Sequence, residues 1–342
     1  MDVHTDQYTL AAMSTGRFVI PLMLLVLTAC PTPPPNSAGG AATSSGVNPD
    51  ACGQLNTTDV GRKVHAFLTA SAELDRGSIE LETTVREACA RMATELQIAT
   101  NGDTATLCDR VAKELEASLE VSVSQEQRLV TRTEPAVCTT ELDFAASVVA
   151  ECEASATADV SIQCDGYCGA TCNGQCNGTC SATAADGSCA GTCDGTCEGS
   201  CSGSCQGGAN VNASAECKAS AEIRADLRTT CTEPKVVVVT ENVTVVDASR
   251  LDRAVKAIEI GMPVLLKAAA KATLVAKAFV HWSKTAVSLA GASGKLVSDL
   301  GARSICVGAQ LATAVAASAE ISARIDVSIQ VSASVSGSAG VQ

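Results

Sequence analysis

The sequence is poor in aromatic and histidine residues. Phe, Trp and Tyr make up 2% of its 342 residues, and it contains three histidines. Its hydrophobic content of 46% therefore comes mainly from Ala, Val, Leu and Ile. A buried alanine contributes little free energy because its apolar area is small. The composition predicts that something besides an ordinary apolar core stabilises the fold.

Positive charge is also scarce. The chain has 24 Lys and Arg residues against 37 Asp and Glu residues, which gives a formal net charge of −13. A protein of this charge repels the phosphates of nucleic acids. We therefore expect no nucleic-acid partner.

The patterns of common catalytic sites are missing as well. His4 falls before the apolar N-terminal run, and we interpret His65 and His281 as surface or boundary residues of helices. The Gly-rich stretch "GASGK" at 291–295 lacks the spacing of a phosphate-binding loop and indicates a helix break. We predict that the protein is not an enzyme, with no catalytic residue, no cofactor and no metal ligand.

The N-terminal residues have the pattern of an export signal. Arg17 precedes the apolar run 18–27, which is too short to span a bilayer as a mature helix. The run ends in Leu27-Thr28-Ala29-Cys30, which resembles the lipobox of bacterial lipoproteins. The resemblance implies that residues 1–29 are a signal peptide and that Cys30 carries the lipid. Because the residues before Met13 are polar, we expect translation to start at Met13.

The resemblance also implies a cellular location. Residue 31 is proline rather than aspartate, which in this family favours the outer membrane over the inner one. Residues 30–50 are rich in Pro, Gly and Ser, so we assign them to the lipid anchor and a flexible linker. Nineteen cysteines agree with export, because an oxidising compartment allows disulfides to persist. We expect an exported protein attached to the bacterial envelope, with the membrane as a partner.

Apolar residues recur at helical spacing in two parts of the chain. The spacing predicts helices over 58–73, 78–98 and 103–115. An alanine-rich region over 249–316 also has helical spacing, with a kink near Pro263 and breaks near Gly291 and Gly294.

Elsewhere apolar or small residues alternate with polar ones. This pattern covers 142–164, 209–227 and 317–341, with shorter stretches at 117–123 and 236–246. Alternation is typical of half-buried strands. Together with the helices it predicts an α+β fold, in which Ala-rich helices pack on long antiparallel strands.

The cysteines form a mirror pattern. Between 164 and 205 they recur every fourth residue in two runs, and each cysteine has a counterpart such that the two residue numbers add to 369. A constant sum is what antiparallel pairing without a bulge requires. The seven predicted disulfides are Cys138–Cys231, Cys152–Cys217, Cys164–Cys205, Cys168–Cys201, Cys172–Cys197, Cys176–Cys193 and Cys180–Cys189.

This arithmetic predicts a long two-stranded ribbon over 138–231 with backbone register i + j = 369. Its Cys/Gly-rich tip covers 164–205 and turns within "SATAADGS" at 181–188. We assign 51–137 to a helical segment plus a strand, and 232–342 to a strand, helices and a C-terminal strand.

Four cysteines remain outside the mirror. We expect two more disulfides among Cys52, Cys89, Cys108 and Cys306, joining the N-terminal and C-terminal helices, with three connectivities open.

Three functions fit this sequence. The first is a lipid-anchored, non-enzymatic envelope protein with a structural, spacer or adhesive role, stiffened by its disulfide ladder. The second is a thiolate metal-binding lipoprotein, because C-x₃-C spacing also permits zinc. The third is an inhibitor or binding module that meets a protein or surface partner through its tip. The two edges of a long ribbon also predict self-association by strand addition.

Overall fold

The computed structural model describes residues 46–122, 130–153, 162–202, 204–211, 213–239, 247–291 and 293–340. The predicted signal peptide, Cys30 and most of the linker lie outside these residues.

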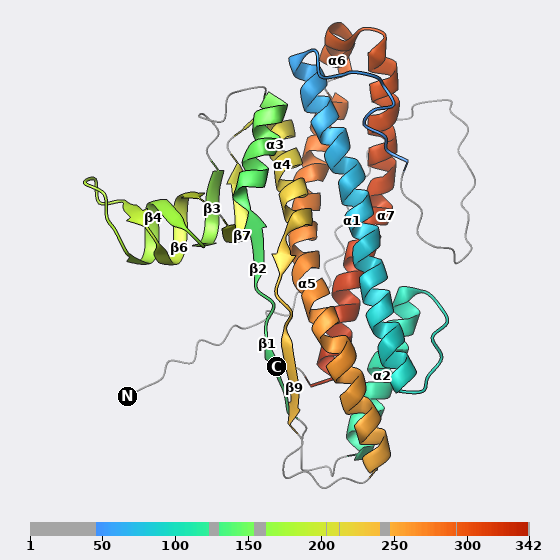
Figure 1. Cartoon of the computed structure of the whole chain (residues 1–342). Helices are drawn as coiled ribbons and strands as arrows, with labels where there is room; N and C mark the ends of the chain where they lie inside the picture. The colour runs from blue at the N-terminus through green and yellow to red at the C-terminus, as the bar shows by residue number, and fades with distance from the viewer. Residues whose placement is uncertain are drawn as a thin grey trace. The chain divides into compact units, whose positions relative to one another are not determined.

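Three long helices form a helical bundle: α1 (Asp59–Glu95), α5 (Ala248–Gly291) and α7 (Arg303–Ser338). Each contacts the other two (Figure 1). α2 (Thr104–Ser122) packs on all three, and the short α6 (Ser293–Leu300) contacts α1 and α7. Among the described helices, α7 alone is long and apolar enough to cross a membrane by length and composition, and 28% of its apolar window is buried.

Alanine is the most frequent buried residue of α5. Ala254, Ala257 and Ala272 are fully buried, and their small side chains allow neighbouring helices to approach closely. The largest buried side chain is Trp282, which stacks on Phe67 with ring centroids 6.0 Å apart. Its indole Nε1 donates a hydrogen bond to Ser71 Oγ at 2.7 Å, so its polar atom is satisfied inside the core.

The predicted helices 58–73 and 78–98 are one continuous helix, α1. Thr58 caps it, since its hydroxyl accepts from the Gly61 N–H at 3.0 Å. Gly77 does not break the helix. A Cβ there would meet the Leu227 side chain, so the glycine instead permits a close helix contact. α5 contains Pro263 and ends at Gly291, where the sequence predicted a break.

Four of the predicted strands are wrong. Residues 142–153 form α3 (Leu142–Glu153), 215–228 form α4 (Ala215–Arg228), and most of 317–341 belongs to α7. The described part of 117–123 belongs to α2.

In α4 the alternation arises because the helix is buried on two sides. Ala219 and Ile223 pack on the helical bundle, whereas Ala221 and Ala225, offset by two residues, pack with α3 and the cysteines. Two i, i+4 pairs on opposite helix faces give the same period of two as a strand.

Short strands connect these helices. β1 (Val130–Glu134) pairs with β9 (Lys235–Val239), and β2 (Cys138–Glu141) pairs with β8 (Thr230–Cys231). Val130 faces Val239 and Cys138 faces Cys231, so the paired numbers add to 369 as predicted. The valine-rich strand predicted at 236–246 is present up to Val239, and its remainder lies outside the described residues. The α+β class with a disulfide-laddered strand pair is confirmed, but the long strands are not.

Candidate functional site

Five strands make up what we call the cysteine coil: β3 (Ile162–Cys168), β4 (Thr171–Cys180), β5 (Cys189–Gly191), β6 (Cys193–Ser202) and β7 (Ser204–Val211). The structure joins in this coil the same five cysteine pairs that the mirror arithmetic gives, with Cα–Cα distances of 5.7 to 6.0 Å. Cys138–Cys231 and Cys152–Cys217 are also bonded. They close the base of the same segment.

The backbone register of the coil differs from the prediction. Cys172 lies opposite Cys201 in the β4–β6 ladder, so the paired numbers add to 373, although the sulfur of Cys172 is bonded to Cys197. On its other edge β4 pairs with β5, where Cys172 lies opposite Gly191 and the numbers add to 363. β3 likewise pairs with both β6 and β7. The flat two-stranded ribbon with backbone register 369 is therefore wrong in this segment.

The two halves of the hairpin are wound around each other instead. The strand order is β5-β4-β6-β3-β7-β2-β8, in which strands from before and after the turn alternate. A flat ribbon would leave one edge of each strand without backbone hydrogen bonds, whereas winding pairs both edges of β4, β6, β3 and β7. The outermost strands of this sheet, β5 and β8, have three and two residues, so its edges offer little for the predicted strand addition.

Sulfur fills the inside of the coil. Eight of its ten cysteines are at most 8% exposed, and they form one buried cluster with side chains of α3 and α4. The disulfides join residues that are not directly opposed in the ladder, which places them across the interior rather than along the surface. All eighteen described cysteines are in disulfides. No group of three or more His, Cys, Asp or Glu side chains in the described ranges could hold a metal ion.

Glycines alternate with the cysteines on the inner face. Gly174 lies opposite Gly199, and Gly178 lies opposite Gly195. A Cβ at Gly178 would lie closer than 3.0 Å to backbone atoms of Asp194 and Gly195. The sequence C-x-G-x-C therefore meets two demands: cysteine supplies the crosslink, and glycine makes room for the facing strand.

The hairpin turn falls where the sequence placed it. Gly187 has a φ of 86° and donates its N–H to Ala184 O at 3.0 Å. Asp186 accepts from the Ser188 hydroxyl at 2.6 Å and from the Ser188 N–H at 3.0 Å. These hydrogen bonds lower the pKa of Asp186 below its ordinary value, so the turn keeps its negative charge in mildly acidic solution.

The outer face of the coil is polar and carries no cation on β4 or β6. Its exposed side chains are Asn173, Gln175, Asn177, Thr179, Asp194, Thr196, Glu198 and Ser200. Asn177 Nδ2 donates to Glu198 Oε1 at 2.8 Å, which links the two strands on this face. Such a face can offer hydrogen bonds to a partner, and it presents no arrangement of nucleophile and base.

Charged pairs attach α3 and α4 to the helical bundle. Arg224 Nε lies 3.1 Å from Glu73 Oε2, and Lys63 Nζ lies 3.6 Å from Glu153 Oε2. Burial alone would raise the pKa of Glu153, but hydrogen bonding to Ser214 and the charge of Lys63 lower it overall. These pairs hold the cysteine coil to the bundle through the two helices on which it packs.

A second set of charges lies between α4 and α5. Burial, reinforced by the charge of Glu222, raises the pKa of Asp226 to about 7, although Lys277 opposes the shift. Burial and nearby lysines lower the pKa of His281, whose Nδ1 lies 3.2 Å from Glu222 Oε2. Sequence reasoning missed the carboxylates because it assigned both to a strand.

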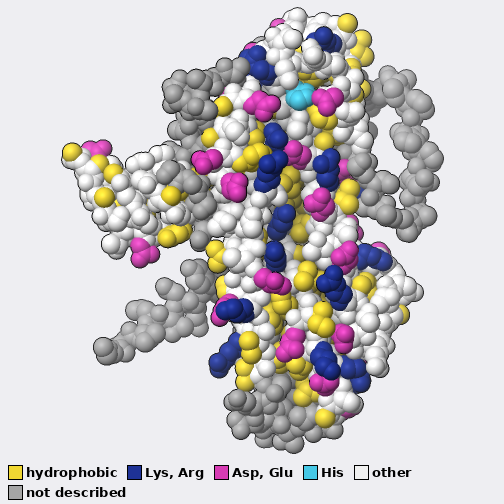
Figure 2. Space-filling model, in the orientation of Figure 1, with side chains coloured by type: hydrophobic (Ala, Val, Ile, Leu, Met, Phe, Trp, Pro, Cys, Tyr) yellow, Lys and Arg dark blue, Asp and Glu magenta, His cyan; other side chains and the backbone are white. Residues whose placement is uncertain are grey.

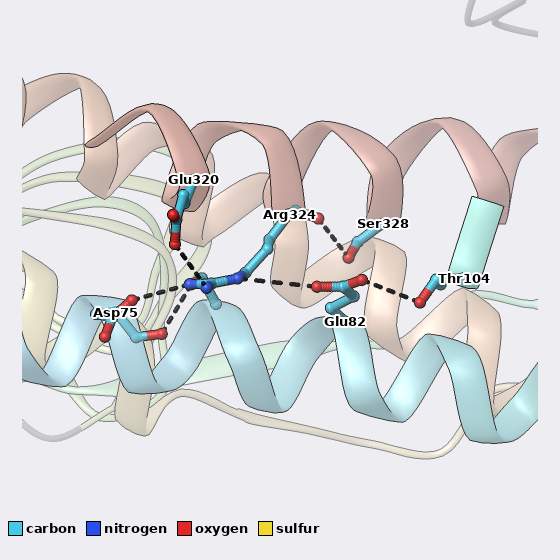
Figure 3. A network of polar contacts seen from close by, with 7 residues as sticks. Asp75, Glu82, Thr104, Glu320, Arg324 and Ser328 are labelled. Carbon is cyan, nitrogen blue, oxygen red and sulfur yellow. Dashed lines mark hydrogen bonds and ion pairs between the residues drawn. The ribbon is translucent and has the colours of Figure 1, made fainter. Parts of the chain in front are cut away.

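Arg324 is the centre of the polar network in Figure 3. Its Nη1 lies 2.9 Å from Asp75 Oδ1 on α1, and its Nη2 lies 3.2 Å from Glu320 Oε2. Glu82 extends the network to α2, since it accepts from Thr104 Oγ1 at 3.0 Å. Asp75 and Arg324 are both nearly buried, so the network fixes α7 against α1. The sequence hid this role because the predicted strand gave Arg324 no partner.

The structure also places the remaining candidates. Cys52 is bonded to Cys306 and Cys89 to Cys108. The first bond ties the N-terminal segment to α7 as expected, whereas the second joins α1 to α2, so one part of that expectation is wrong. His65 Nε2 lies 3.1 Å from Asp50 Oδ1, beside a surface hollow of about 260 Å³.

Comparison with known proteins gives no further identification. No protein-family model matches this chain, and no match was found among curated proteins or among solved structures.

Proposed function

We propose that this chain is a lipid-anchored, non-enzymatic protein of the bacterial envelope, in which the cysteine coil is a rigid structural or adhesive module. Cys30 is the proposed lipid attachment site, and Pro31 favours the outer membrane as its destination. The helical bundle is the base that carries the coil.

One observation carries the proposal. Every described cysteine is in a disulfide, and the coil holds its sulfur inside while polar side chains face outward. Reactive thiols and metal ligands would need the opposite, namely sulfurs that are reduced and accessible. A covalently closed interior with a polar exterior suits a part that must keep its shape outside the cell.

The anchor is tested by mass spectrometry of the membrane fraction. We expect a diacylglycerol-modified N-terminal peptide beginning at Cys30, and we expect Cys30→Ser to release the protein into the soluble exported fraction. An unmodified peptide that extends through Cys30 in the wild-type chain would remove the proposed anchor and leave the account of the coil untouched.

The coil is tested by peptide mapping under non-reducing conditions after blocking of free thiols. We expect the five coil disulfides and no blocked cysteine. Recovery of free thiols together with stoichiometric zinc or copper would instead support the thiolate metal-binding alternative.

The outer face of the coil supports a second candidate, a binding module. Its exposed row of Asn, Thr, Ser and acidic side chains is a hydrogen-bonding surface on a rigid support. Cells that display the wild-type chain should adhere to a polysaccharide- or protein-coated surface better than cells that display Asn173→Ala/Asn177→Ala/Thr196→Ala. Exposed Thr84 and Thr94 of α1 provide a matched alanine control. Equal adhesion by all three strains would favour the structural role.

A further inference from the structure

Charge is distributed unevenly along this acidic chain. Residues 260–319 contain a single acidic residue, Asp299, although the whole chain carries a net charge of −13. The same segment contains six basic residues: Lys267, Lys271, Lys277, Lys284, Lys295 and Arg303. The rest of the molecule is therefore more acidic than the average suggests, and one part of it is basic.

The basic segment also carries the most exposed large apolar side chains. Ile305 is 82% exposed, Val287 is 72% exposed and Val297 is 59% exposed. They lie near the end of α5, on α6 and in the first turn of α7, which follow one another at one end of the helical bundle. Hydrophobic side chains gather at the end that bears the label α6 (Figures 1 and 2). We call Lys284, Val287, Val297, Arg303 and Ile305 the α6 corner.

The described chain begins beside this corner. The Asn48 N–H donates to Gln310 Oε1 at 2.8 Å, Cys52 is bonded to Cys306, and Arg303 donates to the carbonyl of Gln54. Cys30 precedes the first described residue, Gly46, by 16 residues, and 16 residues reach at most about 55 Å when fully extended. A lipid on Cys30 would therefore keep the α6 corner within reach of the bilayer.

We propose that the α6 corner docks on the surface of a bilayer that contains anionic lipids and so forms a second membrane contact. The exposed Val and Ile side chains would enter the interface between headgroups and acyl chains, while Lys284 and Arg303 meet anionic headgroups. The acidic remainder of the chain is repelled from the same surface, which orients the molecule. The distance of the α6 corner from the bilayer rests on the proposed anchor at Cys30, whereas the affinity of the corner for the surface does not.

The test uses residues 30–342 with Cys30→Ser, so that no lipid is attached. Binding is measured by co-sedimentation with vesicles of phosphatidylcholine alone and of phosphatidylcholine with phosphatidylglycerol. We expect binding to the anionic vesicles that weakens as salt is raised, because screening reduces the attraction of the cations. Absence of binding to the anionic vesicles at low salt would overturn the proposal.

Two variants locate the contact. Val287→Glu/Val297→Glu/Ile305→Glu should reduce the partition coefficient about tenfold or more, because each change places a carboxylate at the interface. The matched control Val137→Glu/Val237→Glu alters exposed valines outside the corner and should bind like the parent chain. Circular dichroism of each variant checks the fold, and equal loss in a folded control would contradict the assignment.

Charge is tested separately. Lys284→Gln/Arg303→Gln should weaken binding to anionic vesicles several-fold, whereas Lys113→Gln/Lys256→Gln, on exposed lysines outside the segment, should not. Vesicle binding by the Cys30→Ser chain, together with an unmodified Cys30 in cells, would contradict the lipid anchor and support membrane binding by the α6 corner. A lipid-modified Cys30 in cells, together with no vesicle binding by the Cys30→Ser chain, would support the anchor and contradict membrane binding by the α6 corner.

Discussion

The helical bundle and the cysteine coil are stabilised in different ways. The bundle buries Ala, Leu, Val and Ile around Trp282, and the Arg324–Asp75 ion pair joins α7 to α1 within it. The coil has almost no apolar side chain of its own, and its interior consists of disulfides and glycines. A chain with few aromatics thus uses helix packing where it can place alanines closely and covalent bonds where it cannot. The following experiments separate the two kinds of core.

Reduction should have the largest effect, and it should act on the coil. Without its disulfides the coil has no interior to bury, so we expect amides of β3, β4 and β6 to lose all protection in hydrogen exchange. Amides in the middle of α1, α5 and α7 should stay protected. The oxidised double variant Cys89→Ala/Cys108→Ala, which lacks a bundle disulfide, should retain a protected coil. Protection of the coil after full reduction would show that its backbone ladder suffices.

Loss of the buried tryptophan should act on the bundle. Trp282→Ala leaves a large cavity beside Phe67, and we expect the free energy of unfolding to fall by about 3–5 kcal/mol. Denaturant unfolding followed by circular dichroism measures it. Val280→Ala, on the exposed side of the same helix, should change stability little. Similar losses in both variants would mean that Trp282 is not the centre of the core.

Breaking the ion pair of α7 should have a similar effect for a different reason. Arg324→Met removes the guanidinium that lies 2.9 Å from the buried Asp75 carboxylate, which we expect to cost about 3–5 kcal/mol of folding free energy. The double variant Arg324→Met/Asp75→Leu should recover most of the loss, because it removes the buried charge. Lys113→Met breaks the exposed pair with Asp109 and serves as the control. A double variant as unstable as the single one would contradict this account.

The raised pKa of Asp226 predicts that the stability of the contact between α4 and α5 depends on pH. Its pKa is raised from 3.8 to about 7 on folding. The contribution of Asp226 to the free energy of unfolding is therefore most favourable below pH 3.8, and it is lost as the pH rises towards 7. Asp226→Asn should therefore stabilise the protein, by on the order of a few kcal/mol above pH 7 and by little at pH 4. Thermal unfolding of the parent and of Asp226→Asn from pH 4 to pH 8 measures the difference in stability. Both proteins keep His281, so the difference reports on Asp226. A difference independent of pH would contradict the shift.

The smallest effect should come from the glycines of the coil. Gly178→Ala places a methyl group against the backbone of the facing strand, and we expect a loss of about 1–3 kcal/mol or a lower yield of native disulfides on refolding. Non-reducing peptide mapping after oxidative refolding gives the yield. The neighbouring Thr179→Ala, whose side chain is exposed, should refold like the parent.

The disulfide pattern could be read from the sequence because it depends on symmetry of spacing. The mirror sum of 369 gives all seven pairs of the segment, and the same sum describes the β1–β9 and β2–β8 ladders. It could not give the backbone register of the coil. Sulfur-to-sulfur pairing constrains which side chains meet, whereas the ladder register depends on which strand edges are paired, and winding pairs edges that a flat ribbon leaves open.

The periodicity of α3, α4 and the end of α7 shows where local patterns become ambiguous. Residues such as Ala219, Ala221, Ile223 and Ala225 satisfy a strand pattern and a helix buried on two sides equally well. Alanine and serine add little contrast, because they are tolerated in buried and exposed positions alike. The decision came from tertiary packing, since α4 lies between the helical bundle on one side and α3 on the other.

The sequence by itself determined the seven disulfide pairs of the mirror pattern, the turn at 181–188 and the α+β class. These depend on spacing and on residue chemistry that does not change with context. Tertiary structure alone decided that the cysteine ribbon winds into a coil, that α4 is a helix, and that Arg324 meets Asp75. In each case the outcome depends on which surfaces far apart in the sequence bury each other, and a single chain pattern does not contain that information.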